Sequence, residues 1–195
     1  MKISVTDYKF TLNSLIETLA LLGNWHNMDN QHGERTALMA LKIAARMDKK
    51  LHGEETMILD YAARLHDLGR VGIDDDIMLK SGPLTTAERG AIETHPAIGY
   101  NFLKRSQLPK EITETILYHH ENWDGTGYPK HLKGEEIPLF SRIVHIADVW
   151  DALTEDRPYR KAMDMTAALH TMNMNVSRFD PKLYSIFLQI IREEG

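Results

Sequence analysis

Apolar residues recur at the spacing of one helix face along most of this chain, while the alternation expected of strands is nearly absent. In the segment 32–47, for example, they fall at Ala37, Ala40, Leu41 and Ala44. Residues three, four and seven positions apart share a helix face, whereas a half-buried strand alternates apolar and polar residues. The sequence therefore predicts an all-α fold in the form of a helical bundle.

Proline, glycine and capping residues bound the expected helices. Thr85 and Glu88, three positions apart, form the pattern of a capping box, and prolines at 96 and 109 suit first turns. The expected helical segments are 32–47, 54–68, one beginning near 85, one beginning near 95, 109–120, 139–153 and 180–191. The stretches 70–84 and 121–138 are rich in glycine and proline, which predicts two long loops with a functional role.

Composition limits the class of protein. The chain has 195 residues, which suits one domain with a short appendage, here a helical lead-in at 1–31 before a domain at 32–195. It has no cysteine, so disulfides and thiolate metal sites are excluded. The formal charge of −5 argues against a nucleic-acid binder. No apolar run is long enough for a membrane span, and the start "MKISVTDYKF" lacks the apolar core of a signal peptide. Because the chain has no cysteine, we expect a reducing, cytoplasmic setting.

Histidines and carboxylates occupy unusual places in this pattern. His66 and Asp67 end an otherwise apolar helix, and Asp148 lies within the apolar segment "RIVHIADVWDAL". Polar groups in such surroundings are costly unless they are paired or exposed. Four more histidines stand at expected helix ends: His32, His95, His119 and His120. In a bundle, residues at such positions can converge on one cavity.

These side chains suit a metal site without sulfur. Imidazole and carboxylate ligands favour Fe, Mn, Zn or Mg. His119 and His120 would point about 100° apart in a regular helix, but they can face one ion where the helix ends. Asp67 has two oxygens that could bridge two ions, and ions roughly 3.5–4 Å apart are a usual device for phosphoester hydrolysis. The alternative is that helix-end histidines merely cap backbone carbonyls.

Several other polar residues have no such support. We expect ordinary structural or surface roles for five histidines: His26, His52, His131, His145 and His170. Asp151, three residues after Asp148, is expected to be a structural partner rather than a ligand.

Six separated blocks of the chain resemble HD-GYP domains, a branch of the HD phosphohydrolase superfamily. In order they are "HDLGRVGI", "LKSGPLT", "HPAIGYNFL", "HHENWDGTGYP", "LKGEEIPLFSRIVHIADVWDALTEDRPYRKA" and "FDPKLYSIFL". The resemblance implies a helical bundle of the HD-domain type with a metal centre between its helices. It also implies hydrolysis of cyclic di-GMP to pGpG, with GMP as a further product.

The resemblance assigns a role to each matching residue. The implied metal ligands are His32, His66, Asp67, His95, His119, His120 and Asp148. His32, His66 and Asp148 would hold one divalent ion, the other three histidines a second, and Asp67 would bridge them. The ions would be iron or manganese. A hydroxide between them would attack phosphorus, with His66 and Asp67 at the catalytic centre.

The same resemblance implies substrate contacts and a protein partner. The implied contacts to cyclic di-GMP are Lys80, Arg157, Arg160, Tyr128 and Arg70. Cationic side chains are suitable because the ligand carries two phosphates. The Gly-Tyr-Pro loop could also dock a diguanylate cyclase.

Two positions depart from the family pattern. Met28 stands where some members carry a glutamate for a third metal, and a thioether is a poor ligand for a hard ion, so two ions are expected. Arg70 replaces the usual lysine and cannot donate a proton at ordinary pH. Two alternatives stay open: a non-hydrolytic cyclic-dinucleotide sensor or docking module, and a phosphohydrolase acting on another cyclic dinucleotide or nucleotide.

Overall fold

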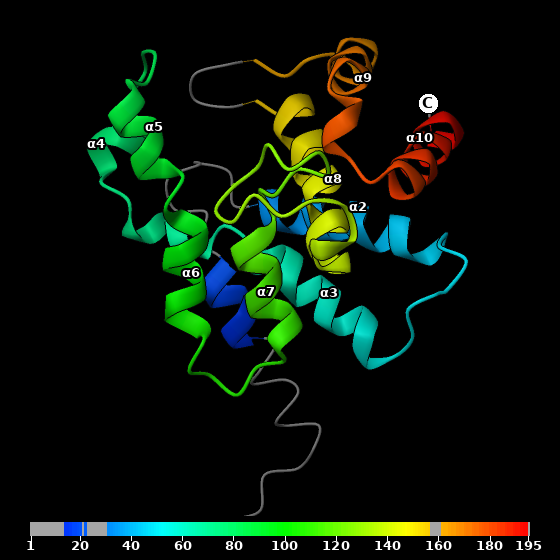
Figure 1. Cartoon of the computed structure of the whole chain (residues 1–195), viewed down its shortest axis with the longest axis horizontal. Helices are drawn as coiled ribbons and strands as arrows, with labels where there is room; N and C mark the ends of the chain where they lie inside the picture. The colour runs from blue at the N-terminus through cyan, green and yellow to red at the C-terminus, as the bar shows by residue number, and fades with distance from the viewer. Residues whose placement is uncertain (1–13, 21, 23–30, 157–160, 195) are drawn as a thin grey trace, which may run out of the picture.

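Helices provide all the regular secondary structure of the described residues, which are 14–20, 22, 31–156 and 161–194 of a computed structural model (Figure 1). Residues 14–20 are helical, and this part of the chain contains no strand. The later elements are α2 (His32–Ala45), α3 (Glu54–Leu65), η2 (Leu68–Gly72), α4 (Asp75–Met78), α5 (Thr86–Ile92), α6 (His95–Leu103), α7 (Lys110–Tyr118), η3 (Gly134–Glu136), α8 (Leu139–Thr154), α9 (Met165–Met174), η4 (Val176–Arg178) and α10 (Pro181–Glu194). The all-α prediction is confirmed.

The main core lies where α2, α3, α8 and α10 pack together. Each contributes a fully buried apolar side chain, such as Ile43, Leu59, Ile146 and Phe187. Their burial stabilises the bundle because apolar surface leaves water.

A second apolar cluster lies on the other side of α3. It joins Ile16 of the first helical segment to Leu65 of α3 and to Ile112 and Ile116 of α7. Helix α3 is therefore packed on both sides, which fixes the position of the residues that follow it, His66 and Asp67.

The predicted helix boundaries are largely correct, and the capping box is present. Thr85 Oγ1 accepts a hydrogen bond from the Glu88 amide at 3.2 Å, and the Glu88 carboxylate accepts one from the Thr85 amide at 2.7 Å. The prediction that 70–84 is only a loop is wrong, because the one-turn helix α4 forms within it. Asp74 caps α4 by accepting a hydrogen bond from the Asp76 amide at 2.8 Å.

Helix α9 was also not expected from the sequence. Asp164 caps it by accepting a hydrogen bond from the Ala167 amide at 2.8 Å. The predicted long loop at 121–138 is present and contains only the short turn η3. None of the helices in the described ranges combines the length and the apolar character that a membrane crossing requires.

Candidate metal centre

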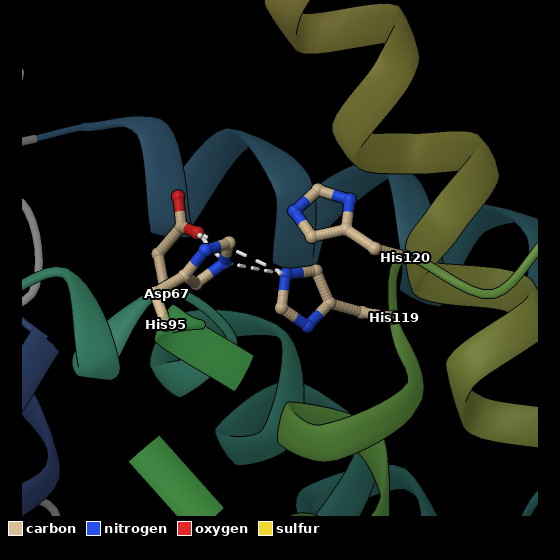
Figure 2. A group of neighbouring side chains, drawn as sticks. All are labelled: Asp67, His95, His119 and His120. Atoms are coloured by element: carbon tan, nitrogen blue, oxygen red, sulfur yellow. Dashed lines mark hydrogen bonds and ion pairs between the residues drawn. The ribbon is translucent and has the colours of Figure 1, made fainter. Parts of the chain in front are cut away.

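Two groups of side chains, buried except for the half-buried His120, meet at Asp67. The first group is His32, His66 and Asp67, and the second group is Asp67, His95, His119 and His120. Within each group, the candidate ligand atoms lie within 4.8 Å of one another. Figure 2 shows the second group, in which His119 and His120 approach from one side and Asp67 and His95 from the other.

Helix ends deliver most of these residues. His32 is the first residue of α2 and His95 the first of α6. His66 and Asp67 directly follow α3, and His119 and His120 directly follow α7. Because α7 ends at Tyr118, the paired histidines leave the regular helix, and their ring centroids lie 4.1 Å apart. The sequence prediction of convergence at helix ends agrees with this geometry.

One oxygen of Asp67 faces the first group. Its Oδ2 lies 3.3 Å from His32 Nε2 and 3.3 Å from His66 Nε2. Asp148, on α8, brings its Oδ1 to 3.3 Å and 3.6 Å from the same two nitrogens. Asp148 therefore joins the first group, as the family resemblance implies.

The other oxygen of Asp67 faces the second group. Its Oδ1 lies 3.2 Å from His95 Nε2 and 3.8 Å from His119 Nε2. The two imidazole nitrogens are 3.2 Å from each other. The two oxygens of one carboxylate thus point at two separate sets of nitrogens, which is the arrangement a bridging ligand needs.

Backbone carbonyls fix the orientation of three imidazole rings. The Nδ1 atoms donate to the carbonyls of Ala63, Ile92 and Ile116, at 2.6 Å for His66, 2.8 Å for His95 and 2.8 Å for His119. A carbonyl oxygen only accepts, so Nδ1 carries a proton in each ring, and Nε2 presents a lone pair whenever the ring is neutral. Metal-binding histidines are commonly held this way.

His32 is oriented by a carboxylate instead. Its Nδ1 lies 2.6 Å from Asp151 Oδ2, and Arg35 binds the same carboxylate through Nε at 2.5 Å and Nη2 at 3.0 Å. The expectation that Asp151 is a structural partner agrees with these contacts.

The two groups have opposite electrostatic character. Burial opposes charge on His32 and His66, but the nearby carboxylates of Asp148, Asp151 and Asp67 outweigh it at His32 and raise its pKa to about 10. At His66 burial is likewise outweighed, chiefly by the Asp67 charge, and the pKa rises to about 9. The first group therefore attracts positive charge.

The second group favours neutral imidazole. Burial, together with the neighbouring histidines, holds the pKa of His119 and of His120 well below the usual range. Both rings are therefore neutral at pH 7, the form that binds metal.

Unsatisfied polar atoms show that a cation fits this site. His66 Nε2 and both oxygens of Asp67 are buried without a hydrogen-bond partner in the described part of the chain. Arg70 approaches Asp67 as an ion pair, with 2.9 Å between Nε and Oδ1. Buried polar atoms without partners are unfavourable, and divalent ions would satisfy the atoms of both groups.

The proposed substrate residues fall into three sets. Arg70 lies at Asp67, and the Tyr128 ring lies 4.9 Å from the His120 ring, with an interplanar angle of 31°. Burial raises the pKa of the Tyr128 phenol, which stays protonated. Lys80 makes a different contact: its Nζ donates to both oxygens of Glu88, at 2.8 Å and 2.7 Å. Arg157, Arg160 and Met28 lie outside the described residues, as does His26.

His145 has a structural role, as expected, although its partner could not be predicted from the sequence. It is buried, and its Nδ1 donates to the His119 carbonyl at 3.0 Å. It lies one turn before Asp148 on α8, and residues three apart share a helix face. Glu121, which the sequence left unassigned, is also buried beside the histidine pair.

The chain is similar to several proteins that are named as phosphodiesterases. It is 34% identical over 194 residues to a cyclic di-GMP phosphodiesterase of Thermotoga maritima, covering 96% of this chain and 52% of the relative. It is 42% identical over 159 residues to the cyclic di-GMP phosphodiesterase response regulator RpfG of Xanthomonas campestris, covering 80% of this chain and 42% of the relative. The 3'3'-cGAMP-specific phosphodiesterase 3 of Vibrio cholerae is 37% identical over 155 residues, or 79% of this chain and 33% of the relative. The chain thus spans about half the length, or less, of these relatives.

The fold has a solved counterpart, and a family model matches most of the sequence. The crystal structure of V-cGAP3, a cyclic GMP-AMP specific phosphodiesterase of V. cholerae, superposes with a TM-score of 0.68 at 22% identity, covering 91% of this chain and 48% of that one. Residues 17–183 match the model of the HD domain. Together with the His66-Asp67 pair at the centre of the bundle, this match shows that the chain belongs to the HD domain family.

Proposed function

We propose that this chain is a metal-dependent phosphodiesterase that hydrolyses cyclic di-GMP. The observation that carries the proposal is the pair of buried histidine–carboxylate groups that share Asp67. Two relatives, at 34% and 42% identity, are named cyclic di-GMP phosphodiesterases, which supports this choice of substrate.

The ligand sets divide between two ions. His32, His66 and Asp148 would hold one ion, His95, His119 and His120 the other, and Asp67 would bridge them. The donor set of imidazole and carboxylate suits iron or manganese. When bound, two such metal ions lower the pKa of a coordinated water and neutralise charge on phosphoryl oxygens.

The chain's own side chains would orient the substrate. Arg70 supplies positive charge beside Asp67, and the protonated Tyr128 hydroxyl offers a hydrogen bond to the substrate at the edge of the second group. Lys80 would have to exchange Glu88 for a phosphate. Arg157 and Arg160 remain predicted phosphate contacts. We propose pGpG as the first product and GMP as the second.

Product analysis tests this proposal. The protein, loaded without oxygen with Fe(II) or Mn(II), should convert cyclic di-GMP to pGpG and GMP, as resolved by chromatography. The double variant His66→Ala, Asp67→Ala should be inactive. Absence of product with either metal would overturn the proposal, and tight binding without product would instead indicate a sensor.

A second substrate is favoured by one observation. The V. cholerae relative at 37% identity is named as specific for 3'3'-cGAMP. Comparing kcat/KM for the two cyclic dinucleotides on the same preparation distinguishes these substrates. Docking of a diguanylate cyclase on the Gly-Tyr-Pro loop stays a prediction.

A further inference from the structure

The loop that follows His120 folds back onto the histidine pair. The Tyr128 amide donates to the His120 carbonyl at 3.1 Å, and the Tyr128 ring lies against the His120 ring. Tyr128 therefore reaches the second group only because residues 121–128 reverse direction. Whatever closes this loop also determines where the phenol lies.

Glu121 closes the loop from inside. Its side chain is buried, with the residue only 1% exposed, and it directly follows His120. One carboxylate oxygen accepts from the Lys130 amide at 2.6 Å and the other from the Leu132 amide at 3.1 Å. Burying a carboxylate is unfavourable unless it is hydrogen-bonded, and hydrogen bonds to a charged acceptor are stronger than neutral ones. Glu121 thus ties the chain beyond Tyr128 to the chain beside His120.

The close approach at Gly127 shows how tightly the loop is folded. A Cβ atom there would lie 2.2 Å from the Asn122 amide nitrogen, 2.4 Å from the His120 carbonyl oxygen and 2.5 Å from the Glu121 Cα. These are backbone atoms, so a side chain at this position cannot be accommodated by rotating a neighbour. The two ends of the loop are therefore in direct backbone contact at Glu121.

A second carboxylate of the same loop provides a contrast. Glu136 is exposed and accepts from the Lys133 amide at 3.0 Å, three residues away. It closes one turn of η3, whereas Glu121 spans nine and eleven residues to its partners. Both bind backbone amides, but only Glu121 lies next to the histidine pair.

We propose that Glu121 is a positioning residue that holds Tyr128 against His120. It thereby fixes where the Tyr128 hydroxyl meets the substrate beside the second group. It acts through the loop and does not itself touch substrate or metal. The part that concerns the substrate rests on the proposed function, while the part that concerns the loop does not.

Amide hydrogen exchange of the Glu121→Gln variant tests the loop directly. The amide side chain keeps one acceptor oxygen but presents an N–H group to the other backbone donor. Exchange at Lys130 and Leu132 should accelerate about tenfold or more, because hydrogen bonds to charged groups are lost or weakened. Amides of α7 should be unchanged, and the metal content should equal that of the wild type. KM for cyclic di-GMP should rise about tenfold, with kcat changed less than KM, since the ligand sets are intact.

Glu136→Gln is the matched control. It should accelerate exchange at Lys133 and leave Lys130, Leu132 and KM unchanged. Unchanged exchange at Lys130 and Leu132 in Glu121→Gln would overturn the proposal. Loss of metal in parallel with faster exchange would also overturn it, because Glu121 would then be holding His120 itself. Faster exchange with an unchanged KM would overturn the proposed role of Glu121 in placing Tyr128 for substrate binding.

The experiment stays decisive in two further cases. If Glu121→Gln does not fold, the wild-type amides decide: exchange at Lys130 and Leu132 as slow as in α7 supports the proposal, and exchange as fast as at exposed amides overturns it. If the wild-type protein hydrolyses no cyclic dinucleotide, the proposed function fails, but exchange and metal content still test the role of Glu121 in the loop.

Discussion

His95 and His119 bring their Nε2 atoms to 3.2 Å from each other, although each ring already donates from Nδ1 to a backbone carbonyl. Two neutral rings held in this way would point lone pairs at one another, which is favourable only if a cation lies between or beside them. Burial, followed by the charge of His120, lowers the pKa of His119, so a proton is a poor cation for this place at pH 7. A metal ion bound by both Nε2 atoms would remove this repulsion.

Asp151→Asn should weaken metal binding at the first group and leave metal binding at the second group unchanged. The amide would lose the ion pair with Arg35 and the charged acceptor for His32 Nδ1. Loss of such a supporting contact typically lowers metal affinity roughly 10- to 100-fold. Metal titration should show one weakened site and one unchanged site.

The matched control for Asp151 is Glu155→Gln. Glu155 lies one turn further along the chain, with Oε1 3.6 Å from Arg35 Nε, but it does not reach His32 in this way. Its replacement should leave both affinities unchanged. Equal weakening of both sites in Asp151→Asn would contradict the division into two groups.

Metal binding should release protons from the first group. The pKa of His32 is raised to about 10 and that of His66 to about 9, so both carry protons at pH 7 in the metal-free protein. Each must lose a proton to bind metal, so the affinity of this half should rise with pH between 7 and 9. Calorimetric titration in two buffers of different ionisation enthalpy measures the protons released. A result of no proton release would contradict the assignment of these two ligands.

The same two histidines predict how the stability of the metal-free protein varies with pH. Their folded pKa values lie above the unfolded value of 6.5, so their contribution is complete below pH 6.5 and is lost as pH rises through about 9–10. In the presence of a chelator, the urea midpoint should therefore fall between pH 7 and pH 10. A constant or rising midpoint would count against the raised pKa values.

His145→Leu should destabilise the turn that carries the histidine pair. The buried His119 carbonyl would lose its donor, which costs ~1–3 kcal/mol of unfolding free energy. His145→Gln keeps a donor and should cost less. Urea unfolding measures both variants, and His170→Leu, at an exposed histidine, should differ from wild type by less than about 0.5 kcal/mol. Equal effects at the two positions would show that the His119 contact is unimportant.

Replacement of glycine by alanine should have opposite effects on stability at Gly127 and at Gly90. Gly127→Ala places a Cβ within 2.5 Å of three backbone atoms and should lower the unfolding free energy by ~2 kcal/mol or more. Gly90 is exposed and lies in the middle of α5, and nothing lies within 4 Å of a Cβ atom built there. Gly90→Ala should therefore raise the unfolding free energy by ~0.5–1 kcal/mol. Thermal or urea unfolding of the pair gives the sign of each effect, and a neutral Gly127→Ala would contradict the close packing of the loop.

Helix ends were the most informative part of the sequence. His32, His66, His95 and the pair at 119–120 stood where apolar periodicity began or stopped, and the chain brings them together with Asp67 and Asp148. Such positions can be predicted because they combine a local pattern with an unfavourable burial of polar groups.

The parts that sequence reasoning missed depend on tertiary contacts. Glu121 binds amides across an irregular loop, and no periodicity relates it to Lys130 and Leu132. His145 lies within a helix that is buried on several sides, so spacing alone could not tell which neighbour it faces. The short helix α4 is capped by Asp74, a signal weaker than that of the surrounding glycine and proline.

Metal stoichiometry of the protein purified without oxygen tests the central claim most directly. Elemental analysis of the wild type should give two ions of iron or manganese per chain. The variant Asp67→Asn should retain fewer, because it removes one charge from the residue that faces both groups. The matched control Asp60→Asn, at an aspartate that pairs with Arg64 on α3, should retain two. A wild-type protein that stays free of metal after incubation with either ion would contradict the account.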